Sequence, residues 1–284
     1  MRYQIRHAIV KYAADTILED VNFEIHDHEK IAIIGRNGCG KTTLLKLISG
    51  EVEMANPDSD EECGIVMAGK QRIGYLRQIS FEDSSIKVEE EILKVFAPVF
   101  SCEKRMQELT EQMKTDTSEH LLKEYAALQA KMEALRGYTY RRDMETMFQR
   151  FGFALKDLQR PIGTFSGGQQ TKVAFVKLLL SQPDIMLLDE PFSALDYQTR
   201  LNVSDDIGKI LKSSGKPAIL VTHDISEAIS MADRVLILSA RPATVRKIID
   251  IDLDISDRTP LSSRNAPDFK KYFNIIWKEL NENA

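Results

Sequence analysis

Eight residues near the start of the chain carry the groups that bind a phosphate chain. Residues 35–42 have the sequence Gly-Arg-Asn-Gly-Cys-Gly-Lys-Thr, which fits a glycine, four residues and then Gly-Lys-Thr. Because glycine has no Cβ, the backbone can wrap closely around the phosphates. Lys41 would reach the β- and γ-phosphates, and the Thr42 hydroxyl would bind Mg²⁺. The residues expected to bind the nucleotide here are Gly35, Arg36, Asn37, Gly38, Cys39, Gly40, Lys41, Thr42 and Thr43.

The segments on either side of this loop predict the strand and the helix that position it. The apolar run Ile31–Ile34 comes before the loop, and a helical stretch over residues 43–48 follows it and ends at Ser49-Gly50. The helix N-terminus adds a partial positive charge, and the loop amides point inward. Cys39 is interpreted as a passive small residue, with sensitivity to oxidation as the alternative.

Length and composition describe a soluble globular protein. The 284 residues are 43% hydrophobic and 29% charged, which allows one large domain or two small ones. The net charge of −5 argues weakly against a nucleic-acid-binding surface over the whole molecule. No apolar run approaches the length of a membrane span, and the first residues lack an apolar signal core. Three cysteines without metal-type spacing predict reduced thiols in the cytoplasm.

The hydrophobic pattern predicts an α/β fold. Apolar and polar residues alternate over residues 1–30, which indicates half-buried antiparallel strands. Later apolar segments are continuous, as in parallel strands buried on both faces. These segments are Ile31–Ile34, Ile185–Leu188, Ala218–Val221 and Val235–Leu238. Helical segments separate them, so we expect a mixed sheet with an antiparallel edge. Residues 51–72 are acidic and are interpreted as a surface excursion.

Two further regions have helical patterns. Residues 88–150 are rich in Glu, Lys, Met and Leu, and apolar residues recur every three or four positions between Leu121 and Leu135. Turn residues at 115–119 divide this region, which predicts a helical hairpin. Its apolar faces either pack on each other only or also dock a partner. Residues 256–284 predict an amphipathic closing helix that packs on the core or in a dimer, because the charges of its polar face are mixed, with membrane contact as the alternative.

Two carboxylates follow a buried strand in the second half of the chain. Asp189 and Glu190 end the apolar run Ile185–Leu188. After a phosphate loop, such a pair is suited to nucleotide hydrolysis: Asp189 would hold Mg²⁺, and Glu190 would act as a general base on the attacking water.

A glycine-rich segment carries a family resemblance. Residues 165–169, Phe-Ser-Gly-Gly-Gln, resemble the signature motif of ATP-binding cassette (ABC) ATPases, whose usual form is Leu-Ser-Gly-Gly-Gln. The resemblance implies a P-loop NTPase fold of ABC type, with an antiparallel edge subdomain and a helical subdomain. It also implies that the motif residues act in trans, completing the site of a second copy. These residues are Ser166, Gly167, Gly168 and Gln169.

The same resemblance extends over residues 1–240 and implies roles for four more residues. Gln78 resembles the glutamine that touches Mg²⁺ and senses the γ-phosphate. His223 follows a buried strand and resembles the switch histidine that contacts the γ-phosphate. The segment 193–196, Ser-Ala-Leu-Asp, resembles the loop that crosses the dimer interface, and Asp196 is its last residue. Tyr12 lies where the family places an aromatic residue that stacks on adenine. The expected catalytic residues are Lys41, Gln78, Glu190 and His223, and the expected Mg²⁺ ligands are Thr42, Gln78 and Asp189.

The two parts of the chain resemble different subfamilies. Residues 1–188 look like the first cassette of F-class ABC proteins, and residues 191–284 look like ATPase subunits of nitrate, sulfonate and taurine-type importers. This pattern leads to the hypothesis of a chimera, natural or constructed. The expected division is a nucleotide-binding core at 1–87 and 151–255, a helical subdomain at 88–150 and a C-terminal helix at 256–284.

The resemblance leaves two functions open. Both use ATP and Mg²⁺ at the interface of a head-to-tail homodimer. In the first, the protein is the ATP-binding subunit of a transporter, in the cytoplasm or peripheral to the inner face of the cell membrane, with transmembrane permease partners. In the second, it is a soluble ATPase that acts on the ribosome. The single cassette in the sequence favours the transporter, and the helical hairpin favours the ribosome.

Overall fold

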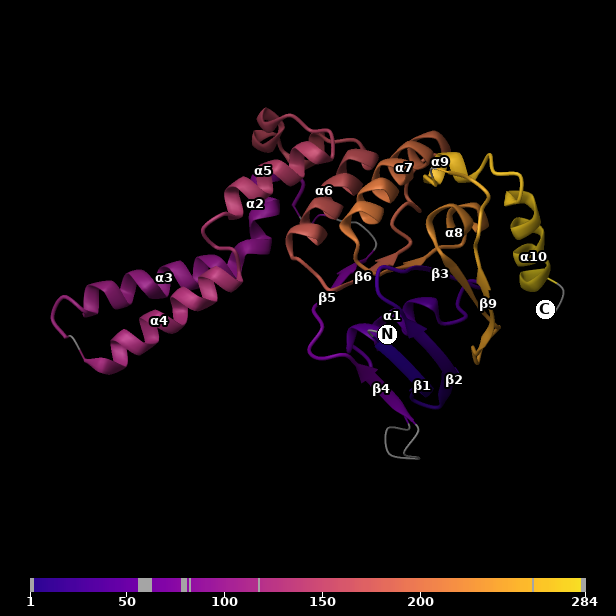
Figure 1. The fold of residues 1–284 in the computed structure, drawn as a ribbon, viewed down its shortest axis with the longest axis horizontal. Coiled ribbons are helices and arrows are strands. Elements are labelled where there is room, and N and C mark those ends of the chain that lie inside the picture. Colours follow the sequence, from indigo (N-terminus) through magenta and orange to yellow (C-terminus); the bar gives the residue numbers. More distant parts are fainter. Residues whose placement is uncertain are drawn as a thin grey trace. The chain divides into compact units, whose positions relative to one another are not determined.

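The computed structural model describes residues 3–55, 63–77, 81, 83–116, 118–256 and 258–281, and the chain forms two compact units. One unit comprises residues 1–80 with 182–284, and the other comprises residues 81–181. Each is described by itself below, and Figure 1 shows the elements of both. Among the described residues, none of the helices combines the length and the apolar character needed to cross a membrane.

A six-stranded sheet forms the centre of the first unit. Its strands, in spatial order, are β5 (Ile73–Leu76), β6 (Ile185–Asp189), β7 (Ala218–Val221), β3 (Lys30–Ile34), β8 (Arg234–Leu238) and β9 (Val245–Asp250). Neighbouring strands are parallel, except that β9 runs antiparallel to β8. The carboxyl ends of the parallel strands therefore meet at one edge, where the predicted site residues follow β3, β6 and β7.

Both faces of this sheet are covered, which explains the continuous apolar strands. Ile31 and Ile33 of β3 face a core shared with α1 (Lys41–Ser49) and with the second sheet. Ala32 and Ile34 point to the other face and join a core with α8 (Ile225–Met231) and α10 (Phe269–Asn281). A strand that is buried on both faces has a continuous apolar sequence instead of alternating apolar and polar residues.

A three-stranded antiparallel sheet packs on the first of these cores. Its order is β2 (Asp15–Ile25), β1 (Tyr3–Tyr12) and β4 (Gly64–Met67). The interpretation of residues 51–72 as a surface excursion is incomplete, because β4 pairs with β1 and Ile65 packs against the core. The strand has only four residues and is half exposed, so its apolar signal is weak.

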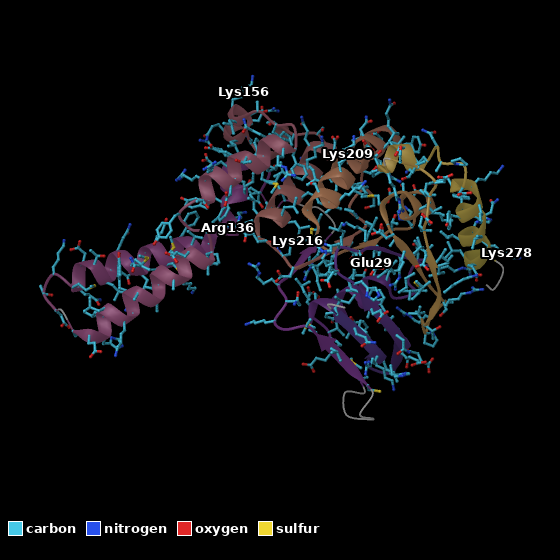
Figure 2. The ribbon with its side chains drawn as sticks, viewed as in Figure 1. Glu29, Arg136, Lys156, Lys209, Lys216 and Lys278 are labelled. Carbon is cyan, nitrogen blue, oxygen red and sulfur yellow. The ribbon has the colours of Figure 1, made fainter. Side chains whose placement is uncertain are left out.

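Helices complete the first unit. The long helix α7 (Tyr197–Ser214) contacts α9 (Pro260–Ser263), which in turn contacts α8. The C-terminal helix α10 buries Ile276 and packs Phe269, Tyr272 and Phe273 against the core beside α8. Its other side is exposed and carries Lys278, which Figure 2 labels, as well as Trp277, which is 56% exposed. The amphipathic pattern of the last segment thus corresponds to core packing.

The second unit is helical. It contains α2 (Val88–Leu93), α3 (Ala97–Gln112), α4 (Glu119–Ala134), α5 (Tyr140–Arg150) and α6 (Gly167–Leu180), with short 3₁₀ turns. Helices α3 and α4 lie side by side where the sequence predicts a hairpin (Figure 1). The compact unit ends at Ser181 rather than at residue 150, because α6 packs against α2 and α5. The division of the chain by function stays a prediction.

Candidate nucleotide site

The phosphate loop connects the end of β3 to the start of α1. Gly38 and Gly40 have φ angles of 76° and 123°, which side chains disfavour. A Cβ on Gly40 would lie 2.9 Å from Cδ2 of Leu18, whose side chain is completely buried. Glycine at position 40 is therefore required both by the backbone conformation and by the close packing of the loop on β2. The first amides of α1 have no acceptor within the helix and can bind an anion.

Lys41 lies inside the loop that it follows. Its side chain is 7% exposed, and Nζ donates hydrogen bonds to the carbonyl oxygens of Gly35 at 2.9 Å and Arg36 at 3.1 Å. A buried ammonium group needs such partners, and oxygens of a phosphate chain could take their place. Cys39 is also buried, and burial raises the pKa of its thiol, with Lys41 opposing this shift.

Asp189 ends β6 beside the first turn of α1. Thr42 Oγ1 donates to Asp189 Oδ1 at 3.3 Å, and the Tyr75 hydroxyl donates to Asp189 Oδ2 at 3.2 Å. Burial raises the pKa of Asp189, whereas these two hydrogen bonds lower it. The predicted pair Thr42 and Asp189 is thus brought together, 147 residues apart in the sequence.

This pair fits a magnesium ion. Mg²⁺ prefers oxygen ligands and is usually held by one or two carboxylates together with substrate phosphates and waters. One carboxylate and one hydroxyl oxygen lie next to each other at the entrance of the phosphate loop. Within the described ranges, there is no cluster of three His, Cys, Asp or Glu residues that would suit a metal held by protein alone.

Glu190 has an unusual backbone conformation that directs its side chain. Its φ angle is 46°, in the left-handed region that residues other than glycine seldom adopt. The backbone holds this conformation, because Glu190 N donates to Val221 O at 3.0 Å and Glu190 O accepts from Ser193 N and Oγ. Glu190 Oε2 lies 3.5 Å from His223 Nδ1. The structure therefore places the two predicted catalytic residues together at the ends of β6 and β7.

The structure describes two of the three other predicted residues, Tyr12 and Asp196. Tyr12 ends β1, and its side chain is 46% exposed, so its ring is accessible for stacking. Asp196 caps α7 by accepting from the backbone amides of Gln198 and Thr199. Hydrogen bonding to the Thr199 side chain and to these amides lowers the pKa of Asp196. Gln78 lies outside the described residues.

The signature segment begins α6 in the second unit. Ser166 and Gln169 form a reciprocal capping box: Gln169 N donates to Ser166 Oγ at 3.3 Å, and Ser166 N donates to Gln169 Oε1 at 3.0 Å. The amides of Gly167 and Gly168 are in the first turn, so α6 offers them no acceptor. This helix start can therefore give two amides and one hydroxyl to an anion.

Phe165, where the ABC pattern has leucine, is buried in an aromatic cluster. Its ring centroid lies 5.6 Å from that of Phe153, and the Arg160 guanidinium lies 4.6 Å from the ring centroid on its face. Phe153 in turn stacks on Phe148 at 4.5 Å. Phenylalanine in place of leucine thus contributes to packing within the second unit, which is the role expected of an apolar side chain at this position.

Residues 18–193 match the ABC transporter family. The chain belongs to this family. It is an ABC-type ATPase with the expected P-loop fold, and the resemblance to ABC proteins is confirmed. It is 31% identical to the uncharacterized ABC transporter ATP-binding protein YtlC of Bacillus subtilis, over 94% of this chain and 89% of that protein.

Relatives of this ABC ATPase include both subfamilies that the sequence resembles. The aliphatic sulfonates import ATP-binding protein SsuB of Bacillus licheniformis is 33% identical, with 93% of this chain and 87% of that protein covered. The ABC transporter F family member 5 of Arabidopsis thaliana is 31% identical, with 75% of this chain but only 30% of that protein covered. The hypothesis of a junction near residue 188 stays a hypothesis.

Solved structures share the fold at low sequence identity. The ATP-binding subunit of an ABC transporter superimposes with a TM-score of 0.63 at 20% identity, over 99% of both chains. A dimeric ATP-binding cassette bound to ADP and Pi superimposes with a TM-score of 0.57 at 19% identity, over 88% of this chain and 99% of that chain.

Sequence reasoning missed Tyr75 as a residue of the ABC site. It lies on β5, and its hydroxyl fixes the second oxygen of Asp189. Burial and the neighbouring Asp189 raise the pKa of this phenol, so it remains a hydrogen-bond donor. In the sequence, this role is indicated only by a residue with a hydroxyl group in the strand Ile73–Leu76. The sequence does not indicate that Asp189 is its hydrogen-bond partner.

Proposed function

We propose that two copies of this chain hydrolyse MgATP at their shared interface and drive a membrane importer. The observation that carries the proposal is the convergence of Lys41, Thr42, Asp189, Glu190 and His223 at the carboxyl ends of three adjacent parallel strands. This is the edge of an open α/β sheet where ligands bind. ATP binding fits the family, and Mg²⁺ fits the oxygen pair at Thr42.

The residues of one copy divide the chemistry. Lys41 and the amides of α1 bind the β- and γ-phosphates and stabilise charge on the transferring phosphoryl group. Mg²⁺, held by Thr42 and Asp189, would supply further positive charge. Glu190 orients the attacking water and accepts its proton. His223, whose Nδ1 lies 3.5 Å from Glu190 Oε2, would position that carboxylate and contact the γ-phosphate.

The second copy completes the site. Ser166 and the amides of Gly167 and Gly168 would bind the γ-phosphate from the opposite side, because the capping box leaves them available. Each site then depends on both copies, because in a two-fold symmetric interface a contact between two different residues occurs twice. Closure on ATP and opening after hydrolysis would supply the mechanical stroke. A dimeric cassette with the same fold supports this arrangement.

The importer role rests on the relatives that match along their length. The match covers 89% of YtlC and 87% of SsuB, and the name of SsuB describes the import of aliphatic sulfonates. An importer ATPase acts at the cytoplasmic face of the membrane through transmembrane permease partners, and we propose these partners and this location here. The choice of solute would belong to other chains.

The ribosome alternative is not favoured. The F family relative is covered over only 30% of its length. The segment from Ala97 to Ala134, which contains the hairpin, has five Lys or Arg and seven Asp or Glu residues, a net charge of −2. RNA binding depends on cations that neutralise phosphates, so this hairpin is poorly suited to ribosomal RNA.

Glu190→Gln provides the test. The variant should bind ATP and form a stable dimer, because the phosphate contacts remain. Its turnover should fall by about 100- to 10,000-fold with the loss of the base. Light scattering with and without MgATP measures the dimer, and phosphate release measures turnover. Wild-type turnover in this variant would contradict the role of Glu190.

The same variant tests the partner. Tagged Glu190→Gln protein is added to detergent-solubilised membranes and to the ribosome fraction of its source cells, with MgATP. The double variant Lys41→Ala/Glu190→Gln is the matched control, because it lacks the cation that binds the phosphates. ATP-dependent capture of an integral membrane permease supports the importer. ATP-dependent capture of ribosomes instead would overturn it.

A further inference from the structure

A partly buried ion cluster includes residues close to His223 in the sequence and has no place in the mechanism above. Arg200, in the first turn of α7, is 19% exposed at its side chain. Its guanidinium faces two carboxylates on the loop and helix that follow β7: Nη1 lies 3.7 Å from Asp224 Oδ2, and Nε lies 3.6 Å from Glu227 Oε1. Both acidic residues are within four positions of His223.

The carboxylates of this cluster hold the residues on either side of His223. Thr222 Oγ1 donates to Glu227 Oε2 at 2.6 Å. Asp224 N donates to Thr222 Oγ1 at 3.1 Å, and Asp224 Oδ1 caps α8 through the amides of Ser226 and Glu227. The residues on either side of His223, Thr222 and Asp224, are therefore both fixed to the cluster. The side chain of His223 itself lies close to Glu190.

The other end of Arg200 contacts a different loop. Nη2 donates to the carbonyl oxygen of Leu195 at 3.0 Å. This carbonyl belongs to the segment 193–196, which begins with Ser193 bonded to Glu190 O and ends with Asp196, the residue expected at the dimer interface. One rigid guanidinium thus connects the loop that follows the catalytic glutamate to the loop that carries the histidine.

The contacts differ in tightness. The bond to Leu195 has ordinary hydrogen-bond length, whereas both contacts to carboxylates are longer than a hydrogen bond. Among the residues that the structure describes, the buried Arg200 Nε has no hydrogen-bond partner. Leaving a buried charged donor unpaired costs free energy, so a small shift of the Arg200 guanidinium toward Glu227 would be favourable. Burial also raises the pKa of Glu227, and Arg200 opposes this shift.

We propose that Arg200 is a positioning residue that couples segment 193–196 to His223. When the dimer closes and this segment moves, the planar guanidinium passes the displacement to Asp224 and Glu227, and these residues set the position of the histidine against Glu190. Lysine cannot replace it, because a single ammonium group cannot bind a carbonyl and two carboxylates in one fixed plane. The proposal rests on the proposed ATP hydrolysis by the dimer.

A double-mutant cycle with His223 tests this coupling. Single-turnover hydrolysis of MgATP is measured for wild type, Arg200→Met, His223→Ala and the double variant. Arg200→Met should lower the hydrolysis rate by about ten- to hundredfold through misplacement of His223. Its MgATP dissociation constant should stay unchanged. In the His223→Ala background the same substitution should change the rate by less than about twofold, since its effect requires the histidine.

Two further variants separate positioning from folding. Arg200→Lys keeps the charge and should not restore the rate. Lys209→Met removes another cation from α7, one that pairs with Asp205 and lies on the same helix (Figure 2), and it should leave the rate unchanged. Thermal unfolding checks that all variants are folded at the assay temperature.

Each outcome decides a different claim. An equal loss of rate in the two His223 backgrounds would mean that Arg200 acts on stability or elsewhere, and would overturn the coupling while leaving the ATPase intact. Full activity of Arg200→Lys would also overturn it. A folded wild-type dimer that does not hydrolyse MgATP would refute the proposed function, and the coupling with it.

Discussion

The two glycine-containing helix starts of this ABC ATPase are built in opposite ways. At the start of α1, Gly38 and Gly40 adopt positive φ angles, Gly40 packs tightly on β2, and Lys41 binds back to the loop. At the start of α6, Gly167 and Gly168 are ordinary helical residues, and a serine–glutamine capping box supports them. Both ends can offer amides to phosphate, but only the first has backbone conformations that favour glycine.

This difference shows why each motif needs glycine. The phosphate loop needs it within its own chain, because another residue would strain the fold even without a nucleotide. In the signature segment, Gly167 is exposed and helical, whereas Gly168 is buried. A glycine at position 167 would let a phosphate held by another copy approach the helix start, where a side chain would block it. The comparison thus supports a site shared between two copies.

Gly167→Asp should give the largest effect. The position is exposed and begins α6, and an acidic residue there stabilises a helix start by roughly 0.3–1 kcal/mol. Its carboxylate would repel the γ-phosphate of the second copy, so turnover should fall by about 100- to 1,000-fold. Nucleotide binding by a single copy should be unchanged. Phosphate release measures turnover. A nucleotide titration at a protein concentration too low for dimer formation measures binding by a single copy.

Loss of nucleotide binding in Gly167→Asp, or turnover close to wild type, would contradict the comparison. Gly152→Asp is a control in the same unit. Its φ is positive and a Cβ there has open space, so a small loss of stability without loss of turnover is expected.

Gly40→Ala should give the next effect, on stability as well as on binding. The φ angle of 123° and the contact with Leu18 together should cost about 1–3 kcal/mol in the free energy of unfolding. Nucleotide affinity should fall with the distorted loop. Gly38→Ala is the matched variant, since a Cβ there meets nothing within 4 Å, and it should cost less. Urea unfolding without nucleotide compares them, and equal losses would show that packing on β2 is unimportant.

Phe165→Leu should give the smallest effect. It restores the usual ABC residue but removes the contacts with Phe153 and Arg160. We expect a loss of about 1 kcal/mol in the free energy of unfolding and no change in turnover. Thermal unfolding and phosphate release measure these. A clear change in turnover would mean that the aromatic ring shapes the signature segment itself.

The sequence predicted the layered fold because buried parallel strands have continuous apolar runs, as in β3 and β7. It missed β4, whose four half-exposed residues lie in an acidic segment. The site residues follow strands whose ends meet in the sheet, so motif positions predicted that Thr42, Asp189 and Glu190 converge.

Long-range contacts outside these motifs could not be predicted in this way. The hydrogen bond from Tyr75 to Asp189 joins residues 114 positions apart, and no local pattern specifies it. The left-handed conformation of Glu190 is imposed by bonds to Val221 and Ser193. Arg200 is an unremarkable cation on the polar side of a helix pattern until the fold places Asp224 and Glu227 against it.

One mixing experiment tests the shared site most directly. Lys41→Ala chains are combined with Gly167→Asp chains, and ATP turnover is compared with each variant alone. A dimer of the two contains one site with both defects and one intact site, so turnover should reappear. Lys41→Ala mixed with Glu190→Gln is the control, because every site then keeps a defect. Recovery in the first mixture alone is the predicted result, and turnover no higher than the sum of the separate variants would contradict the account.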